Sequence, residues 1–348
     1  MEEQLRSRYT AFQKLVKRPA QIERVRLTSW REYFCLFKVF STVDAWTWAF
    51  RGQEDATWHL TTSLEREFED RSEVKNHERE GESYRDADDF KIRNQSPLVR
   101  NEVRVIDAFR AVARAHGVLQ GCGERSIDVL ALMQHYGSKT RLLDFSYSFA
   151  IATYFSFERR MTGKSRSVWA INLDALLAKM EMVKREIFND KANDDGMDVV
   201  GRGVWPQNLV RCFKDQFLNV ADRVLGQHGE VGSGVIPIPV DGNNKRLVAQ
   251  NGTFLFPLNN NKSFEENLAD AISVSLDQIK ALASEGNRSR RSFGSRELHD
   301  ATVLKIDFDP CMEEQAWRVL EQLNVLPRNV YPDLTGIAKS MHFEYDSL

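Results

Sequence analysis

The stretch QHYGSKTRLLDFSYSFAIATYFSFE, residues 134–158, joins a dense polar cluster to an apolar segment. The apolar part, residues 147–160, is hydrophobic on nearly every side, which predicts a helix at the centre of the core, with Asp144 or Ser146 as its N-terminal cap. Buried polar groups need partners, because an unpaired buried charge or hydrogen-bonding group is costly. The polar part is therefore either scaffold or a site. Its candidate side chains are Gln134, His135, Arg141 and Asp144.

Two helices are expected before this stretch. Residues 101–117 carry apolar side chains at helical spacing, and Gly117 suits the position that follows the last turn. A second helix is expected over Ile127–Tyr136, with Ser126 as its cap and Gly137 as its stop. Together with the central helix they predict a helical layer around the polar cluster.

The rest of the chain mixes helical and strand-like patterns. Helical character covers residues 1–45, 174–188 and the stretch EENLADAISVSLDQIKALASE. Short segments rich in β-branched and aromatic residues predict strands. These are residues 45–52, 166–173, 235–240, 246–250, 252–258 and 302–308. The pattern predicts an α+β fold: a single mixed domain with a central apolar helix, a small and mostly antiparallel sheet and a helical N-terminal portion.

The composition limits the class of protein. Lysines and arginines number 48 against 50 aspartates and glutamates, a net charge of −2, which gives no sign of binding to nucleic acid or to a membrane surface. The N-terminus lacks the apolar core of a secretory signal, and no stretch approaches about 18 apolar residues, so we expect a cytoplasmic protein without a membrane span. The cysteines lie far apart and the histidines lack metal-ligand spacing, so neither disulfides nor a metal site is expected.

Several segments of the chain occur together in a known family. They read FRGQEDATWHLTTSLER at 50–66, LMQHYGSKTRLLDFSYSFAIATYFSFE at 132–158, RLVAQNGTFLF at 246–256 and VYPDLTGIAK at 330–339. In this combination the chain resembles the bacterial FRG domain family, which is named for the Phe-Arg-Gly found here at 50–52. Lys139 stands where the family usually has proline and Ser146 where it has threonine. Neither change removes a group that is expected to function.

The resemblance also sets the expected domain limits and a line of chemistry. It covers roughly residues 28–340, which leaves 1–27 as an N-terminal helical extension, with charged insertions near 69–95 and 185–233. The Phe-Arg-Gly at a strand end is similar to the first-strand arginine motif of ADP-ribosyltransferases, enzymes that use NAD. By this analogy the resemblance implies NAD as a cofactor.

Residues of the first two motifs have structural as well as functional interpretations. Arg51 could grip a phosphate, with Gly52 allowing close backbone approach, or it could be buried against a carboxylate such as Asp144 or Glu102. Arg141 and Asp144 form either part of a site or a local ion pair. Both interpretations are compatible with the sequence.

The same choice applies to the end of the second helix and to the third motif. Gln134 and His135 lie in the last helical turn, where a histidine is either structural or part of a site. Gln250 and Thr253 could hydrogen-bond a ligand, with the neighbouring glycine making room. Alternatively, the dipeptide at 251–252 makes a tight turn between strands and nothing more.

Two classes of function remain open. The first is an NAD-dependent, ADP-ribosyltransferase-like enzyme that acts on a protein target as a toxin or phage-defence effector, with Glu102 stabilising an oxocarbenium-like state. His135 and Gln250 are the other catalytic candidates, and either Tyr136 or Phe254 stacks on nicotinamide. The second is a binding module of a bacterial defence or stress system, which recognises a nucleotide, another small molecule or a protein without turnover. The expected ligand contacts are Arg51, Gln134, Tyr136, Arg141, Asp144, Arg246, Thr253 and Phe254.

Overall fold

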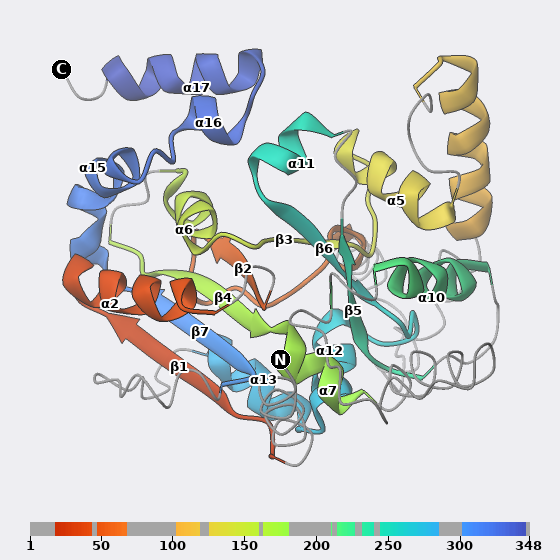
Figure 1. Ribbon diagram of the computed structural model, residues 1–348, viewed down its shortest axis with the longest axis horizontal. Helices are drawn as coiled ribbons and strands as arrows, with labels where there is room; N and C mark the ends of the chain where they lie inside the picture. The colour runs from red at the N-terminus through yellow and green to blue at the C-terminus, as the bar shows by residue number, and fades with distance from the viewer. Residues whose placement is uncertain are drawn as a thin grey trace, which may run out of the picture.

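A mixed β-sheet of seven strands forms the centre of the described part of the chain (Figure 1). The structure is a computed structural model, and it describes residues 18–43, 47–67, 102–118, 125–159, 163–180, 210, 214–226, 232–239, 244–284 and 301–345. The strands are β1 (Ile22–Leu27), β2 (Trp48–Gln53), β3 (Leu143–Ser146), β4 (Arg166–Asn172), β5 (Val235–Pro239), β6 (Gly252–Pro257) and β7 (Val303–Phe308). Their order is β1-β7-β4-β2-β3-β6-β5, with β1 parallel to β7 and the other neighbours antiparallel. The expected α+β class and mostly antiparallel sheet are confirmed.

Helices cover both faces of this sheet. They are α2 (Trp30–Ser41), α5 (Ser126–His135), α6 (Phe149–Phe157), α7 (Leu173–Lys179), α10 (Lys214–Gly226), α11 (Lys245–Ala249), α12 (Phe264–Ile272), α13 (Leu276–Ala283), α15 (Glu313–Gln322), α16 (Pro327–Val330), α17 (Leu334–Tyr345) and a helix over residues 102–115. In β4, Val168 and Ala170 pack with α2, α6 and α15, whereas Trp169 and Ile171 pack with α5, α7, α10, α12 and α13. Because alternate side chains enter two different cores, every residue of β4 is buried.

The predicted central helix is α6, and it lies directly against β2. All of its residues except Phe155 are buried. The close approach is possible because β2 carries glycine at the contact. A Cβ on Gly52 would lie 1.9 Å from the carbonyl oxygen of Ala152 and 2.8 Å from the backbone nitrogen of Ser156. The glycine of the Phe-Arg-Gly motif therefore makes room for the helix backbone.

The N-terminal part contains a strand where the sequence predicted helix. β1 pairs in parallel with β7 along its length, and Val25 and Leu27 are fully buried. Across this pair Arg24 Nε forms an ion pair with Asp307 Oδ2 at 2.6 Å. Charged residues alternate with apolar ones in β1, so the segment did not read as a buried strand. Its partner strand lies nearly three hundred residues away in the chain. The helical prediction for residues 1–45 is therefore correct at α2 and wrong at β1.

The strand predicted over residues 246–250 is also wrong. This segment forms most of helix α11, because the side chain of Asn244 caps the helix by accepting from the backbone N–H groups of Arg246 and Leu247. Asn251, with a φ of +44°, ends the helix and turns the chain into β6. The apolar run that suggested a strand has no fully buried residue.

The predicted caps differ from those in the structure. Asp144 and Ser146 lie in strand β3, and α6 is capped instead by Ser148, whose hydroxyl accepts a backbone N–H of the first turn. Ser126 is the first residue of α5, and the cap position is Arg125, which makes no side-chain capping bond. The cap of α5 is displaced by one residue and that of α6 by two or more, which local sequence preference does not resolve.

Some predictions fall on parts of the chain that the structure does not describe. Most of the N-terminal extension, residues 1–17, lies outside the described residues. The insertion near 69–95 lies entirely outside them, and the insertion near 185–233 lies largely outside them apart from α10. The domain limit between residues 27 and 28 stays a prediction, although β1 joins the sheet from before that limit.

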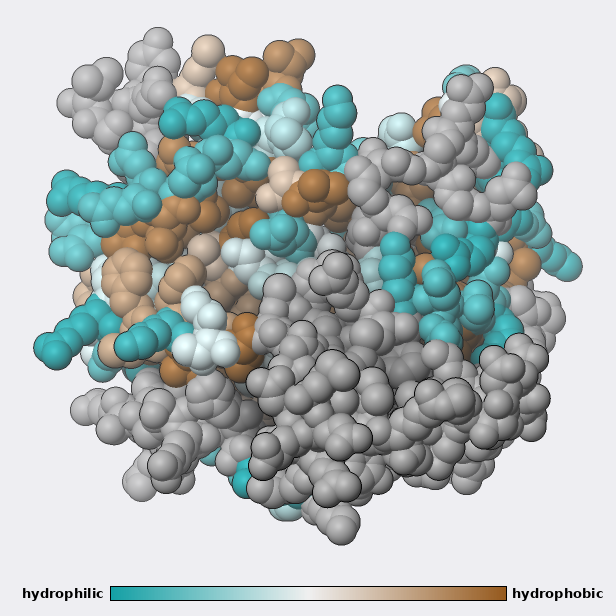
Figure 2. Space-filling view, in the orientation of Figure 1, coloured by the Kyte–Doolittle hydropathy of each residue, from teal (hydrophilic) through white to brown (hydrophobic). Residues whose placement is uncertain are grey.

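The C-terminal helices close one edge of the fold. Helix α17 exposes an apolar stripe of Leu334, Ile337 and Met341, which are 82%, 50% and 57% exposed, and Figure 2 shows hydrophobic atoms gathered at this place.

Tyr331, between α16 and α17, is buried, and its ring centroid lies 6.3 Å from that of Phe155. The motif at 330–339 thus attaches the C-terminal helices to α6.

Two substitutions in α6 test its predicted packing. Phe157 is 2% exposed and packs 5.3 Å from Phe308, so Phe157→Ala should lower the free energy of unfolding by about 3–5 kcal/mol. Phe155→Ala should cost clearly less, because this ring is half-buried and lines a pocket. Urea denaturation of the two variants measures the difference. Equal losses would contradict the orientation of the helix.

Candidate functional site

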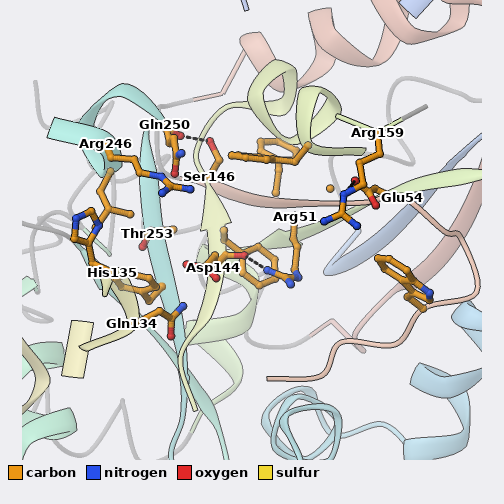
Figure 3. Close-up of a pocket in the computed structure, with 17 residues that line it drawn as sticks. Arg51, Glu54, Gln134, His135, Asp144, Ser146, Arg159, Arg246, Gln250 and Thr253 are labelled. Carbon is orange, nitrogen blue, oxygen red and sulfur yellow. Dashed lines mark hydrogen bonds and ion pairs between the residues drawn. The ribbon is translucent and has the colours of Figure 1, made fainter. Parts of the chain in front are cut away.

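A pocket opens where strands β2 and β3 separate. The two strands pair at one position, Phe50 with Ser146, after which β2 continues beside β4 and β3 continues beside β6. A cavity of about 480 Å³ lies at this separation (Figure 3). Its lining residues are Phe50, Arg51, Gly52, Glu54, Trp58, Gln134, His135, Asp144, Phe145, Ser146, Phe155, Arg159, Arg246, Leu247, Gln250, Thr253 and Phe254. Residues of the three long sequence motifs therefore converge on one site.

Arg51 bridges the gap between the two strands. Its Nη1 donates to the backbone carbonyl oxygen of Asp144 at 2.8 Å, so the side chain replaces a bond of the missing strand pair. The Nε atom is shielded from solvent and has no hydrogen-bond partner among the described residues. Burial lowers the pKa of the Arg51 guanidinium, the nearby Asp144 carboxylate raises it, and Arg66 lowers it. Arginine nevertheless stays protonated in proteins, so the pocket contains a fixed, incompletely satisfied cation.

Two carboxylates also line the pocket. Asp144 is exposed, while the side chain of Glu54 is only 13% exposed and lies 3.6 Å from Arg159 Nε. Figure 3 shows Glu54 and Arg159 together on one side of Arg51, with Asp144 on the other. With Arg246 included, three arginines face two carboxylates in the pocket. An anionic ligand is favoured by this balance.

The wall opposite Arg51 comes from the ends of α5 and α11. The side-chain oxygen of Gln134 already has a hydrogen-bond partner, because Oε1 accepts from the hydroxyl of Thr140. His135 is exposed, and its ring makes no hydrogen bond within the described chain. Partial burial and the charge of Arg246 lower the pKa of His135. Gln250 Nε2 is shielded from solvent and has no partner among the described residues, so an amide donor is available at this wall.

Two lining hydroxyls are already used by the fold. Ser146 Oγ donates to the carbonyl of Gln250 at 2.7 Å and fixes β3 against the end of α11. Thr253 Oγ1 donates to the carbonyl of Ile238 at 3.2 Å and lies 3.1 Å from the hydroxyl of Tyr147. The structure therefore supplies Thr253 with partners of its own, which fits the structural interpretation better than direct ligand binding.

Arg246 is held by the C-terminal motif. Its guanidinium carbon lies 4.6 Å from the centroid of the Tyr331 ring, and Lys339 Nζ lies 4.1 Å from the same centroid. The hydroxyl of Tyr331 donates to Glu158 Oε1 at 2.7 Å. Glu158 also pairs with Lys339. This network fixes a second cation at the pocket, on the side away from Arg51 (Figure 3).

Three predicted site residues lie outside the pocket lining. Arg141 Nη2 forms an ion pair with Glu102 Oε2 at 2.7 Å, and both side chains are nearly buried, at 6% and 11% exposed. The Arg141 guanidinium also lies 4.5 Å from the ring centroid of Phe256. Tyr136 is 61% exposed and is not among the residues that line the pocket. The local ion pair expected between Arg141 and Asp144 is therefore wrong, and the partner of Arg141 is Glu102.

The remaining predicted residues do come together. Arg51, His135 and Gln250 share the pocket, as do Gln134, Asp144, Arg246, Thr253 and Phe254. Phe254 is 1% exposed, so it forms the floor and offers little ring surface for stacking.

Sequence reasoning missed several residues of the lining, among them Glu54, Trp58, Phe155 and Arg159. Glu54 and Trp58 belong to the first motif, FRGQEDATW, so their place in that motif was the available signal.

The Arg141–Glu102 pair generates a stability prediction. Arg141→Met should lower the free energy of unfolding by about 3–5 kcal/mol, because Glu102 is left nearly buried without its partner. Adding Glu102→Gln should recover most of this loss, since an uncharged pair needs no counter-ion. Urea denaturation of both variants provides the measurement. A loss below about 1 kcal/mol for the single variant would mean that solvent screens the pair.

The described residues contain no group of three or more histidine, cysteine, aspartate and glutamate side chains arranged to hold a metal ion. In the same part of the chain, no helix combines the length and the apolar character that crossing a membrane requires.

Comparison with known proteins identifies one family. Residues 46–165, about a third of the chain, match the family model described as the FRG domain. Comparison with curated proteins and with solved structures found no match. The matched region supplies β2, β3, α5 and α6, while Arg246 and Gln250 come from beyond it. The chain therefore contains an FRG domain, and the matched region contributes Arg51 to the pocket together with Gln134 and His135 of the opposite wall.

Proposed function

We propose that the pocket binds a phosphate-bearing, nucleotide-like ligand, with Arg51 as its phosphate contact. The observation that carries the proposal is the state of Arg51: one end of its guanidinium is fixed by a backbone carbonyl, and its Nε is shielded from solvent without a partner in the described chain. A buried cation is costly unless an anion completes its environment. The planar guanidinium presents paired donors that match the oxygen geometry of a phosphate.

The other walls support a ligand with both anionic and flat parts. Arg246 adds a second cation, and Gln250 offers an amide donor that has no partner among the described residues. Trp58 and Phe155 add aromatic surface. A cavity of about 480 Å³ falls in the usual range for sites that bind small molecules.

NAD is the ligand to test first. Its diphosphate suits the arginines and its two flat rings suit the aromatic walls. In an ADP-ribosyltransferase-like reaction, the bond between nicotinamide and ribose breaks, nicotinamide leaves, and the ADP-ribosyl group passes to an acceptor such as a protein side chain. A carboxylate stabilises the positive charge that develops on the ribose. Glu54 takes the role first considered for Glu102, because its carboxylate lines the pocket. The protein would then act as a toxin or phage-defence effector.

A second candidate is a binding module without turnover in a defence or stress system. Both lining carboxylates lie beside arginines: Glu54 lies 3.6 Å from Arg159, and Asp144 raises the pKa of Arg51 through its charge. This arrangement suits carboxylates that orient the arginines and do not act on a ribose. The ligand would then be held as a signal.

Substitution of Arg51 tests ligand binding. Arg51→Lys keeps the charge and loses the planar fork, so NAD should bind at least about tenfold more weakly. The melting temperature should stay within about 3 °C of the wild-type value. Titration calorimetry and a thermal melt measure the two quantities, with Arg31→Lys on the exposed side of α2 as the control. A large drop in melting temperature with unchanged NAD affinity would make Arg51 a structural residue.

Turnover is tested separately by incubating the protein with NAD and measuring free nicotinamide. Release that is lost in Glu54→Gln, while NAD affinity is kept, supports the enzyme. Tight binding without release supports the binding module. If the wild-type protein binds no NAD, the choice of NAD is wrong.

A further inference from the structure

An exposed tryptophan stands at the edge of the pocket. Trp58 is 48% exposed although it lines the cavity, whereas Phe50, Phe145 and Phe254 in the same lining are almost completely buried. Large aromatic side chains tend to be buried, so one that is left half open beside a cavity points to a ligand contact. A flexible loop would weaken this inference, because ordering the side chain on binding would oppose affinity.

The loop that carries Trp58 is fixed on the side before it. The backbone N–H of Ala56 donates to the carbonyl of Ser165 at 2.8 Å, and the N–H of Trp58 itself donates to the carbonyl of Asp55 at 3.2 Å. Lys164 Nζ forms an ion pair with Asp55 Oδ2 at 2.7 Å. The loop is thereby tied to the residues that lead into β4.

The side after Trp58 is fixed as firmly. Gln53 Nε2 donates to the carbonyl of His59 at 2.9 Å, and Gln53 Oε1 in turn accepts from the indole of Trp169 at 2.8 Å. The backbone N–H of Leu60 donates to Glu265 Oε1 at 2.9 Å. Anchors on both sides present the Trp58 side chain from a preorganised backbone.

A buried lysine provides a further anchor for this loop. Lys305 is completely buried in β7, its Nζ donates to the carbonyl of Ala56, and the same Nζ lies 4.8 Å from the ring centroid of Trp169. Burial lowers the pKa of Lys305 to about 8. A lysine in the middle of a sheet is costly to bury, and the ammonium of Lys305 donates a hydrogen bond to the loop. Lys305 therefore serves to hold the loop in position.

We infer that Trp58 is the stacking platform for a planar heteroaromatic ring of the ligand, and that Lys305 is a positioning residue that acts through it. The inference rests on the proposed function, because it specifies which part of the nucleotide-like ligand meets which wall. Arg51 contacts the phosphate, and Trp58 contacts the ring. Stacking tolerates any flat ring, so the subsite selects for aromaticity and not for one base.

Two probes that share a ribose phosphate separate the subsites. ADP-ribose carries an adenine ring, and ribose 5-phosphate carries none. Trp58→Ala should weaken ADP-ribose binding by roughly five- to hundredfold and leave ribose 5-phosphate binding unchanged. Trp58→Phe should recover part of the affinity, and Phe34→Ala, an exposed aromatic on α2, should have no effect. Titration calorimetry on the full chain provides the affinities.

The outcomes distinguish the two levels of the proposal. If both probes bind and Trp58→Ala weakens both equally or neither, the stacking inference is wrong while the phosphate site stands. If neither probe binds the wild-type protein, the proposed function and the stacking inference both fall.

A double-mutant cycle tests Lys305. Lys305→Met should weaken ADP-ribose binding in the wild-type background, and it should add little in the Trp58→Ala background, because the two residues act in series. Equal effects in both backgrounds would show that Lys305 does not act through Trp58, as would no effect in either. If Lys305→Met fails to fold, Lys305→Gln replaces it in the cycle and the same outcomes decide the role of Lys305.

Discussion

The close approach of α6 to β2 at Gly52 is the constraint on which the rest of the structure depends. A side chain there would collide with the backbone of Ala152, so no other residue fits without moving the helix. Phe50, on the same face of the strand, packs 5.4 Å from the ring of Phe149 at the start of that helix. Side chains alternate along a strand, so Arg51 between them points away from α6. The Phe-Arg-Gly motif thus combines two residues that pack against α6 with an arginine on the other side of the strand, whose Nε has no partner among the described residues.

The separation of β2 from β3 turns this arrangement into a site. Arg51 spans the gap by bonding to the backbone of Asp144, which leaves an incompletely satisfied cation inside the sheet. The loop after β2 contributes Trp58, and its anchors include a buried lysine from β7. The C-terminal motif adds Arg246 through the ring of Tyr331. Segments far apart in the chain therefore build one pocket, and each is held by contacts that belong to the fold.

Sequence patterns predicted elements whose signal is local and missed those that depend on distant partners. The apolar run of α6 predicted a central helix, but the burial of β1 depends on pairing with β7. The motifs predicted that Arg51, His135, Arg141 and Gln250 line a common cleft; Arg51, His135 and Gln250 do, and Arg141 does not. Arg141 looked equivalent to Arg51 in sequence, because nothing local shows that Glu102 neutralises it. Burial and pairing of a charged side chain are tertiary properties, so composition and spacing cannot separate a ligand-binding arginine from a structural one.

The central claim is that Gly52 is a packing residue that sets the position of α6 and of Arg51. Urea denaturation of Gly52→Ala tests it most directly, with Gly232→Ala as the control, because a Cβ on Gly232 would meet no atom within 4 Å. The account predicts that Gly52→Ala lowers the free energy of unfolding by about 1–3 kcal/mol or more, and that Gly232→Ala changes it by about 0.5 kcal/mol or less. Equal stability of the two variants would contradict the account.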